Sequence, residues 1–164
     1  MKKLVLITLL VFQCVSFTLA QAPAGAWIPV NAKWQKAPAD INPNLSTAST
    51  HVLYFQPDGK MSVIGCVVNQ QSGHYAISAG DGQTVAVGDW HEKNGQIVAH
   101  WRLVFRTVPK VGEKLPGPWV DEVLKSKDGR LVLKGVFYRR VPDLDKGAAE
   151  LMPQAGGPRL ESPS

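Results

Sequence analysis

Histidines are the residues of this chain best suited to catalysis or metal binding, because imidazole titrates near neutrality and ligates transition metals. His91-Glu92 begins like the helical zinc-protease motif, but Gly95 occupies the place of its second histidine, and the segment has the composition of a turn. The other three histidines fall on different predicted strands, so a shared metal site would require all of them to lie side by side on one face. We therefore expect separate histidines, either solvated or hydrogen-bonded, and no bound metal or other cofactor. These three are His51, His74 and His100.

Two further motifs fail because of their context. The segment that begins Gly80-Asp81-Gly82 resembles a dinucleotide-binding loop, but Val85 stands at the third glycine position and no helix is expected to follow. Ser72 lies close to His74, but the flanking glycines and the strand-to-helix turn of a nucleophile elbow are absent. Carboxylates occur singly, and the neighbours Asp121 and Glu122 should point to opposite faces of their strand. The sequence thus offers no catalytic constellation, and we expect a protein that is not an enzyme.

Asp-Gly and Asn-Gly pairs, which favour tight turns, divide the chain into the segments that carry these side chains. Asp and Asn tolerate left-handed backbone angles and Gly adopts them freely, so an Asp-Gly or Asn-Gly pair closes a hairpin whose twist matches that of its strands. Each pair is followed by Lys, Gln or Arg and then by apolar and β-branched residues. Four such turns predict an antiparallel meander. The pairs are Asp58-Gly59, Asp81-Gly82, Asn94-Gly95 and Asp128-Gly129.

Between the turns, the apolar residues repeat every second position, which is typical of strands with one buried face. Segment 96–106 places Ile97, Ala99, Trp101, Leu103 and Phe105 on one face. Segment 130–139 is interpreted as a single strand, with Leu131, Leu133 and Phe137 on one side and Lys134 and Tyr138 on the other. Eight strands are predicted in all, at 27–30, 51–56, 60–68, 74–79, 84–90, 96–106, 119–125 and 130–139.

The fold class that follows is all-β, an up-and-down antiparallel meander. A sheet of this many strands removes its exposed edges by closing on itself, so we expect an eight-strand barrel rather than a sandwich. Gly65, Gly88 and Gly135 interrupt the strand patterns, where glycines are typical of bulges and bends.

The two ends of the chain differ from this domain. Residues 1–20 begin with Lys2-Lys3, continue with a short apolar run and end in Ala20, as a cleavable secretory signal does. We expect a secreted or periplasmic protein with no membrane span, a spacer at 21–25 and a barrel domain at 26–140. Residues 141–164 are rich in Pro and Gly, and we expect a disordered tail there with at most a brief helical turn at 148–152.

Charge and cysteine content exclude some partners. Without Lys2 and Lys3, the 18 basic residues become 16 against 13 acidic ones, a formal charge of +3. These charges are spread along the chain, so no nucleic-acid partner is expected. Cys66 is the single cysteine after the leader, and it lies in an apolar strand. A buried thiol is the favoured interpretation, and an intermolecular disulfide or a reactive thiol is the alternative.

One sequence signature resembles a known family. Gly25-Ala26-Trp27 is similar to the Gly-x-Trp motif that opens the first strand of lipocalins and related calycin barrels. Arg139 or Arg140 ends the last predicted strand, where that family places an arginine against the tryptophan. The resemblance implies an eight-strand antiparallel barrel, open at one end, that binds a small apolar molecule.

The aromatic residues are the candidate ligand contacts. We expect Trp27, Trp101, Phe105 and Phe137 to line a pocket for a small lipophilic ligand. An eight-strand barrel is just wide enough either to hold one small ligand or to be filled by its own side chains. In the second case the protein would act through its outer surface, as an envelope-associated protein-binding or inhibitory module. The connection 108–118 would then be a partner-contact loop; a lid over the open end and an ordinary surface loop are the other interpretations.

Overall fold

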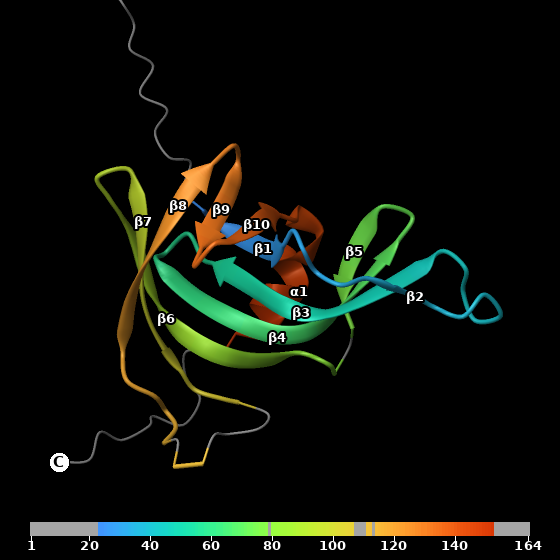
Figure 1. The fold of residues 1–164 in the computed structure, drawn as a ribbon, viewed down its shortest axis with the longest axis horizontal. Helices are drawn as coiled ribbons and strands as arrows, with labels where there is room; N and C mark the ends of the chain where they lie inside the picture. Colours follow the sequence, from blue (N-terminus) through green and yellow to red (C-terminus); the bar gives the residue numbers. More distant parts are fainter. Residues whose placement is uncertain (1–22, 79, 107–110, 113, 153–164) are drawn as a thin grey trace, which may run out of the picture.

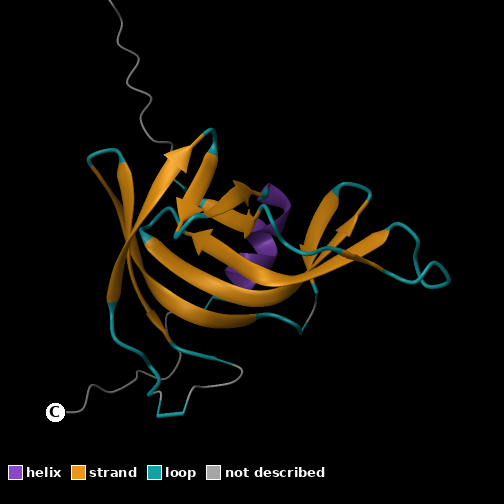
Figure 2. Cartoon of the chain, in the orientation of Figure 1, coloured by secondary structure: helices purple, strands orange, loops and turns teal. Residues whose placement is uncertain are grey.

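The computed structural model describes residues 23–78, 80–106, 111–112 and 114–152, and these form one antiparallel sheet with two short helical segments (Figures 1 and 2). The strands are β1 (Gly25–Pro29), β2 (Gln35–Lys36), β3 (Leu45–Phe55), β4 (Lys60–Gln71), β5 (His74–Ile77), β6 (Gln83–Lys93), β7 (Gln96–Leu103), β8 (Val120–Lys127), β9 (Arg130–Leu133) and β10 (Val136–Arg140). A 3-10 helix, η1 (Pro142–Leu144), and a short helix, α1 (Asp145–Glu150), follow β10.

The sheet closes into an eight-strand barrel, as the sequence predicted. Its order is β2-β3-β1-β10-β9-β8-β7-β6-β4-β5, and an additional pairing of β3 with β4 joins the two sides. Each barrel strand pairs with the next barrel strand along the chain, and β1 pairs with β10 to complete the ring. β2 and β5 stay outside the ring and flank the parts of β3 and β4 that extend beyond it, at the right of Figure 1.

The eight strands of the barrel are not the same eight segments that the sequence predicted. The predicted strand 74–79 corresponds to β5, which lies outside the ring, and the predicted strand 130–139 is a hairpin of β9 and β10. Lys134 and Gly135 form the turn between these two, with φ angles of 49° and 80°. Because the turn resets the alternation, Tyr138 packs against the interior and Phe137 faces outward, 39% exposed. The predicted inward position of Phe137 is therefore wrong.

Three of the four predicted hairpin turns are confirmed. Asp58-Gly59, Asn94-Gly95 and Asp128-Gly129 join β3 to β4, β6 to β7 and β8 to β9. Asp81-Gly82 closes no hairpin, because β5 and β6 both pair with β4 and not with each other. Gly82 instead lies against the C-terminal segment, where an added Cβ would be 2.1 Å from a methyl carbon of Leu151.

Two clusters of buried side chains lie on opposite faces of the barrel wall. The inner cluster fills the barrel and includes Trp27, Leu53, Phe55, Ile97 and Leu124. The outer cluster lies between the outer face of β1, β3 and β4 and the segment after β10, and includes Ile28, Val52, Ile64, Cys66 and Leu144. Cys66 is 6% exposed, as the favoured interpretation of this residue predicted, and burial raises the pKa of its thiol to about 11.

The C-terminal segment corrects the predicted domain boundary. Val141, Leu144 and Ala148 are buried against the outer face, and η1 and α1 span residues that we expected to be a disordered tail. The folded unit thus extends at least to Met152. The predicted leader, 1–20, and the part of the predicted tail at 153–164 lie outside the described residues. No helix in the described part of the chain is long and apolar enough to cross a membrane.

Candidate functional site

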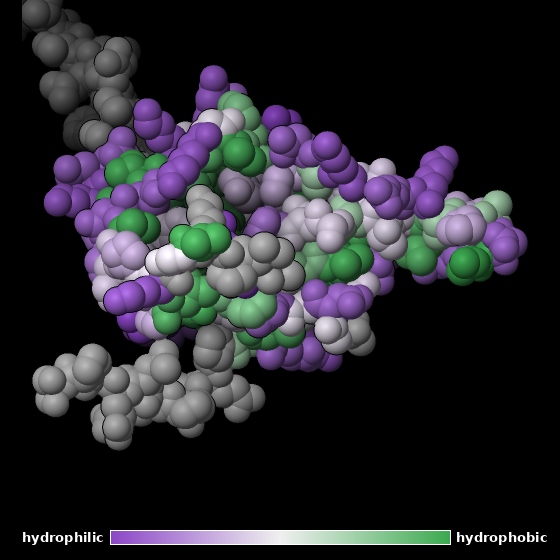
Figure 3. All heavy atoms as spheres, turned by 60° about the horizontal axis from the view of Figure 1, so that its bottom comes forward, coloured by the Kyte–Doolittle hydropathy of each residue, from purple (hydrophilic) through white to green (hydrophobic). Residues whose placement is uncertain are grey.

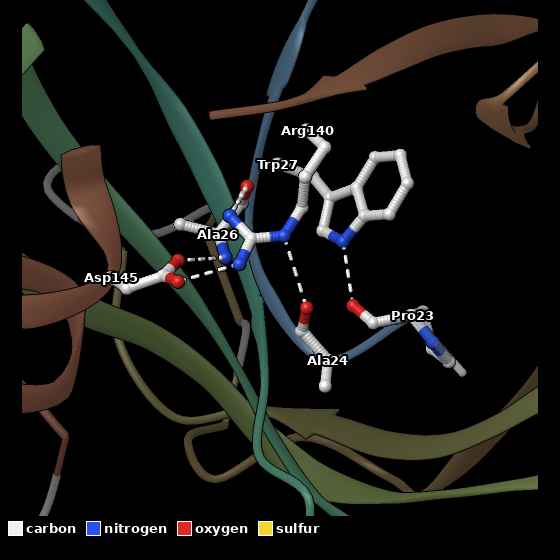
Figure 4. Close-up of polar contacts among 6 residues, drawn as sticks. All are labelled: Pro23, Ala24, Ala26, Trp27, Arg140 and Asp145. Atoms are coloured by element: carbon white, nitrogen blue, oxygen red, sulfur yellow. Dashed lines mark hydrogen bonds and ion pairs between the residues drawn. The ribbon is translucent and has the colours of Figure 1, made fainter. Parts of the chain in front are cut away.

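At one end of the barrel, the start of β1 lies beside the end of β10, and polar contacts join the two (Figure 4). The indole nitrogen of Trp27 donates a hydrogen bond of 2.6 Å to the carbonyl oxygen of Pro23. Arg140 is the register partner of Trp27, and its guanidinium donates to the carbonyl oxygens of Ala24 and Ala26. It also pairs with Asp145, whose other carboxylate oxygen accepts a hydrogen bond from the amide of Ala26. The first strand is thereby fixed to the last strand and to α1.

These contacts show which of the two candidate arginines, Arg139 or Arg140, lies beside the start of the first strand. Arg140 lies beside Gly25 and is paired in register with Trp27. Arg139 points to the outer surface, where its guanidinium lies 4.9 Å from the ring centre of Tyr75 and donates to the hydroxyl of that residue. The spacer predicted at 21–25 also needs correction, because Pro23 is buried and Gly25 begins β1.

The other end of the barrel is open and holds a pocket of about 590 Å³. Its wall comes from the end of β1, from the middle of β3 and β4, from the start of β6 and from the residues after β7. The lining residues are Pro29, Asn31, Ala32, Lys33, Ser49, Thr50, His51, Gly65, Cys66, Val67, Asp81, Gln83, Val85 and Phe105. The volume lies within the range of small-molecule sites.

A bulge shapes the wall of this pocket. The register of β4 against β6 shifts between Val63 and Ile64, so Val85 on β6 has no partner across the ladder. The carbonyl oxygen of Val85 accepts hydrogen bonds from the amides of Val104 (2.9 Å) and Phe105 (3.2 Å). Bulges are common at barrel rims, where they redirect side chains. Here the bulge brings two apolar lining residues, Val85 and Phe105, together.

The pocket combines apolar walls with polar side chains that make no hydrogen bond to other described residues. Pro29, Val67, Val85 and Phe105 supply the apolar part. Ser49, His51 and Gln83 supply hydroxyl, imidazole and amide groups, and none of these three makes a side-chain hydrogen bond within the described residues. Such a lining suits a ligand with an apolar body and a polar group.

A second pocket, of about 510 Å³, lies on the other side of segment 104–106. Trp101 and Leu103 of β7 and Val120 and Glu122 of β8 line it, together with Lys134 and residues of the connection between β7 and β8. Glu122 is 18% exposed, and its carboxylate pairs with the ammonium of Lys134 at 2.6 Å. Figure 3 shows the side of the molecule that carries this connection, where hydrophobic residues (green) lie among hydrophilic ones (purple).

The four predicted ligand residues do not share one pocket. Trp27 is buried at the closed end, and Phe105 lines the 590 Å³ pocket at the open end. Trp101 lines the 510 Å³ pocket, and Phe137 lies on the outer surface. Sequence reasoning named His51 only as a possible metal ligand and missed its place in the pocket, although strand alternation carries the signal: His51 has the same parity as Leu53 and Phe55, which face inward.

The candidate residues for chemistry are dispersed. His74 on β5 lies 3.5 Å from Asp143, and His100 on the outer face of β7 contacts Asp121 at 2.6 Å and stacks on Trp119. No group of three or more His, Cys, Asp or Glu residues in the described ranges could hold a metal ion, so the shared histidine site is excluded there. Asp121 and Glu122 point to opposite faces, as predicted, because one contacts His100 outside and the other lines the second pocket.

Comparisons with protein-family models, with curated proteins and with solved structures gave no match. The likeness to lipocalins is thus a likeness of barrel architecture.

Proposed function

We propose that this chain is an exported, non-enzymatic β-barrel that binds one small apolar or amphipathic molecule in the 590 Å³ pocket at its open end. The observation that carries the proposal is the pocket itself, because it lies on the inner side of a closed barrel whose opposite end is filled by packed side chains. Its lining joins an apolar wall to Ser49, His51 and Gln83, so an amphipathic ligand would satisfy both parts.

The expected affinity is modest. Burying about ten methylene groups gains on the order of 8 kcal/mol, whereas association costs roughly 4 to 15 kcal/mol. Hydrogen bonds to the polar lining residues would have to supply the remainder. We therefore expect binding that is saturable but well short of nanomolar.

The test is a titration with N-phenyl-1-naphthylamine, a neutral apolar dye whose fluorescence rises on leaving water. The normal protein should bind it saturably, and Val67→Trp, which fills the pocket, should abolish that binding. Val123→Trp is the matched control, because Val123 lies on β8 and is 47% exposed. Absence of saturable binding, or equal binding by both variants, would contradict the proposal.

A second function is favoured by a different observation. Three apolar side chains near the connection between β7 and β8 are exposed outside the second pocket, namely Val111 (107%), Trp119 (45%) and Val123 (47%). Exposed apolar groups that gather on one surface are typical of protein contacts. In this alternative the barrel acts as an envelope-associated protein-binding or inhibitory module.

This alternative requires a partner that depends on those side chains. Affinity capture from the source cells should retain the same protein with the normal chain and with a control that lacks two distant exposed residues, Val30→Ser with Ile41→Ser. The double variant Trp119→Ser with Val123→Ser should lose it. Retention by both double variants would remove this second function.

A further inference from the structure

β3 has an unpaired stretch on the side where β1 and β2 pair with it. β1 pairs with the end of β3, where Trp27 is opposite Leu53, and β2 pairs with its beginning, where Gln35 is opposite Thr47. Neither of these two strands pairs with residues 48–52. On its other side β3 pairs with β4 along its whole length, without a register shift. β3 is therefore a continuous strand with a gap along one edge.

Pro29 and the connection that follows β1 explain this gap. Proline has no amide hydrogen, so Pro29 cannot donate to the carbonyl oxygen of His51, which the register places opposite it. Residues 27–35 of the chain lie opposite residues 47–53 of β3, so this connection is two residues longer than the stretch of β3 that it crosses. The connection therefore cannot continue the ladder, and it leaves the edge of β3 open.

The backbone groups at this open edge can be identified. Successive residues of a strand direct their amide and carbonyl groups to alternate sides. The carbonyl oxygen of Leu45 accepts a hydrogen bond from the amide of Ala37, which follows β2, so the odd-numbered residues of β3 direct their backbone groups toward β1 and β2. Within the described residues, the N–H and C=O of Ser49 and the C=O of His51 have no hydrogen-bonding partner.

This edge belongs to the wall of the 590 Å³ pocket. Residues 49–51 and residues 31–33 both line the pocket, so the space between β3 and the connection is part of it. Val67, Val85 and Phe105 supply the apolar part of the wall. An open strand edge beside an apolar pocket is the arrangement by which proteins bind an extended peptide: hydrogen bonds to the edge hold the peptide backbone, and the pocket accepts alternate side chains.

On the basis of the function proposed above, we propose that the ligand of this pocket is a short, extended peptide segment. The segment adds to β3 as an antiparallel strand, in the gap between β1 and β2. Its residues opposite Ser49 and His51 make backbone hydrogen bonds to these two. Because opposite residues of an antiparallel pair share a face, both of their side chains enter the apolar part of the pocket, and the residue between them points away from it.

The probe is the uncharged tripeptide acetyl-leucyl-alanyl-leucinamide, and calorimetric titration of the full chain should show saturable binding. Two N-methylated isomers test the backbone bonds. A methyl group on the nitrogen of the second leucine removes the donor to Ser49 and should raise the dissociation constant about tenfold or more, because an acceptor is left unpaired. A methyl group on the alanine nitrogen, which faces away from β3, should raise it less than about twofold. Both isomers have the same composition.

Ser49→Pro tests the same contact from the side of the protein. The N–H of Ser49 faces the gap and not β4, and proline is tolerated where a strand edge is open, so this variant should fold. It should still bind N-phenyl-1-naphthylamine, whereas its dissociation constant for the tripeptide should rise about two- to tenfold, the range that one hydrogen bond provides. Val67→Trp, which fills the pocket, should abolish the binding of both molecules.

The peptide proposal is overturned if the normal chain does not bind the tripeptide, if the two methylated isomers bind equally, or if Val67→Trp still binds the tripeptide. The isomers decide the question even where Ser49→Pro fails to fold, because they are measured on the normal chain. Saturable binding of the dye without binding of the tripeptide would contradict the peptide proposal alone. Failure of both molecules to bind would contradict the proposed function as well.

Discussion

The guanidinium of Arg140 occupies the space that a side chain at Gly25 would need. A Cβ atom added to Gly25 would lie 1.9 Å from a terminal nitrogen of Arg140, and Gly25 has a φ of +105°, which side chains rarely adopt. The glycine of the Gly-x-Trp signature is therefore required by a contact at the closed end, together with the backbone angle.

Gly25→Ala tests this contact. We expect a loss of about 2–6 kcal/mol in the free energy of unfolding, because backbone strain and overpacking each cost roughly 1–3 kcal/mol. Urea denaturation measures it. Gly73→Ala is the control, since Gly73 also has a positive φ, of +84°, but nothing lies within 4 Å of its added Cβ. Equal losses in the two variants would show that Arg140 exerts no steric demand.

The pH dependence of stability should carry a contribution from Cys66. Burial raises the pKa of its thiol to about 11 from 9.0, so the unfolded chain loses this proton before the folded chain does. The stabilisation is full below pH 9 and is lost as the pH rises to 11. Cys66→Ala should unfold with a shallower fall in stability between pH 9 and pH 11, as measured by urea titrations. Identical slopes would mean that the thiol is not desolvated.

The segment after β10 should contribute to stability. Leu144 is fully buried, so Leu144→Ala should reduce the free energy of unfolding by about 2–5 kcal/mol. Lys146 lies two residues after Leu144, on the exposed side of α1, so Lys146→Ala should change the free energy of unfolding by less than about 0.5 kcal/mol. Thermal unfolding distinguishes the two. A neutral Leu144→Ala would restore the expectation of a tail that begins at Val141.

Export remains a prediction from residues 1–20. Expression of the full chain in a bacterial host should give a mature protein that begins at Gln21, and mass spectrometry of the periplasmic fraction measures this. Ala20→Phe places a large residue at the cleavage position and should block processing, because signal peptidases require a small residue there. Ala22→Phe, beyond the cleaved bond, should be processed normally. A chain that keeps Met1 in both variants would contradict the leader.

Local chemistry made the architecture predictable. The Asn94-Gly95 and Asp128-Gly129 pairs have positive φ at both residues, which is the geometry that the residue types favour. Lys134-Gly135 was missed because lysine is not a typical residue for a left-handed angle, although Lys134 has a φ of 49°. That single omission reversed the faces assigned to Phe137 and Tyr138.

Composition misled at the C-terminus. Prolines and glycines between Val141 and Ser164 indicated an unfolded tail, but Val141, Leu144, Ala148 and Leu151 repeat at intervals of three and four residues, as one face of a helix does. This apolar spacing favoured a helix, but the repeat was too short to outweigh the high proline and glycine content of the segment. The two pockets were beyond prediction because they depend on the bulge at Val85 and on the path of segment 104–106, which pairwise strand patterns do not specify.

The closed end also determines when the chain can fold. The amide of Ala26 is bonded to the carboxylate of Asp145, 119 positions further along the chain, and β1 pairs with the last strand. The barrel therefore cannot close until nearly all of the chain is present. Contacts between residues so far apart in the sequence form slowly. A chain that threads through a secretion channel from its amino end would thus arrive on the far side still open, and would assemble there only after its final helix had followed.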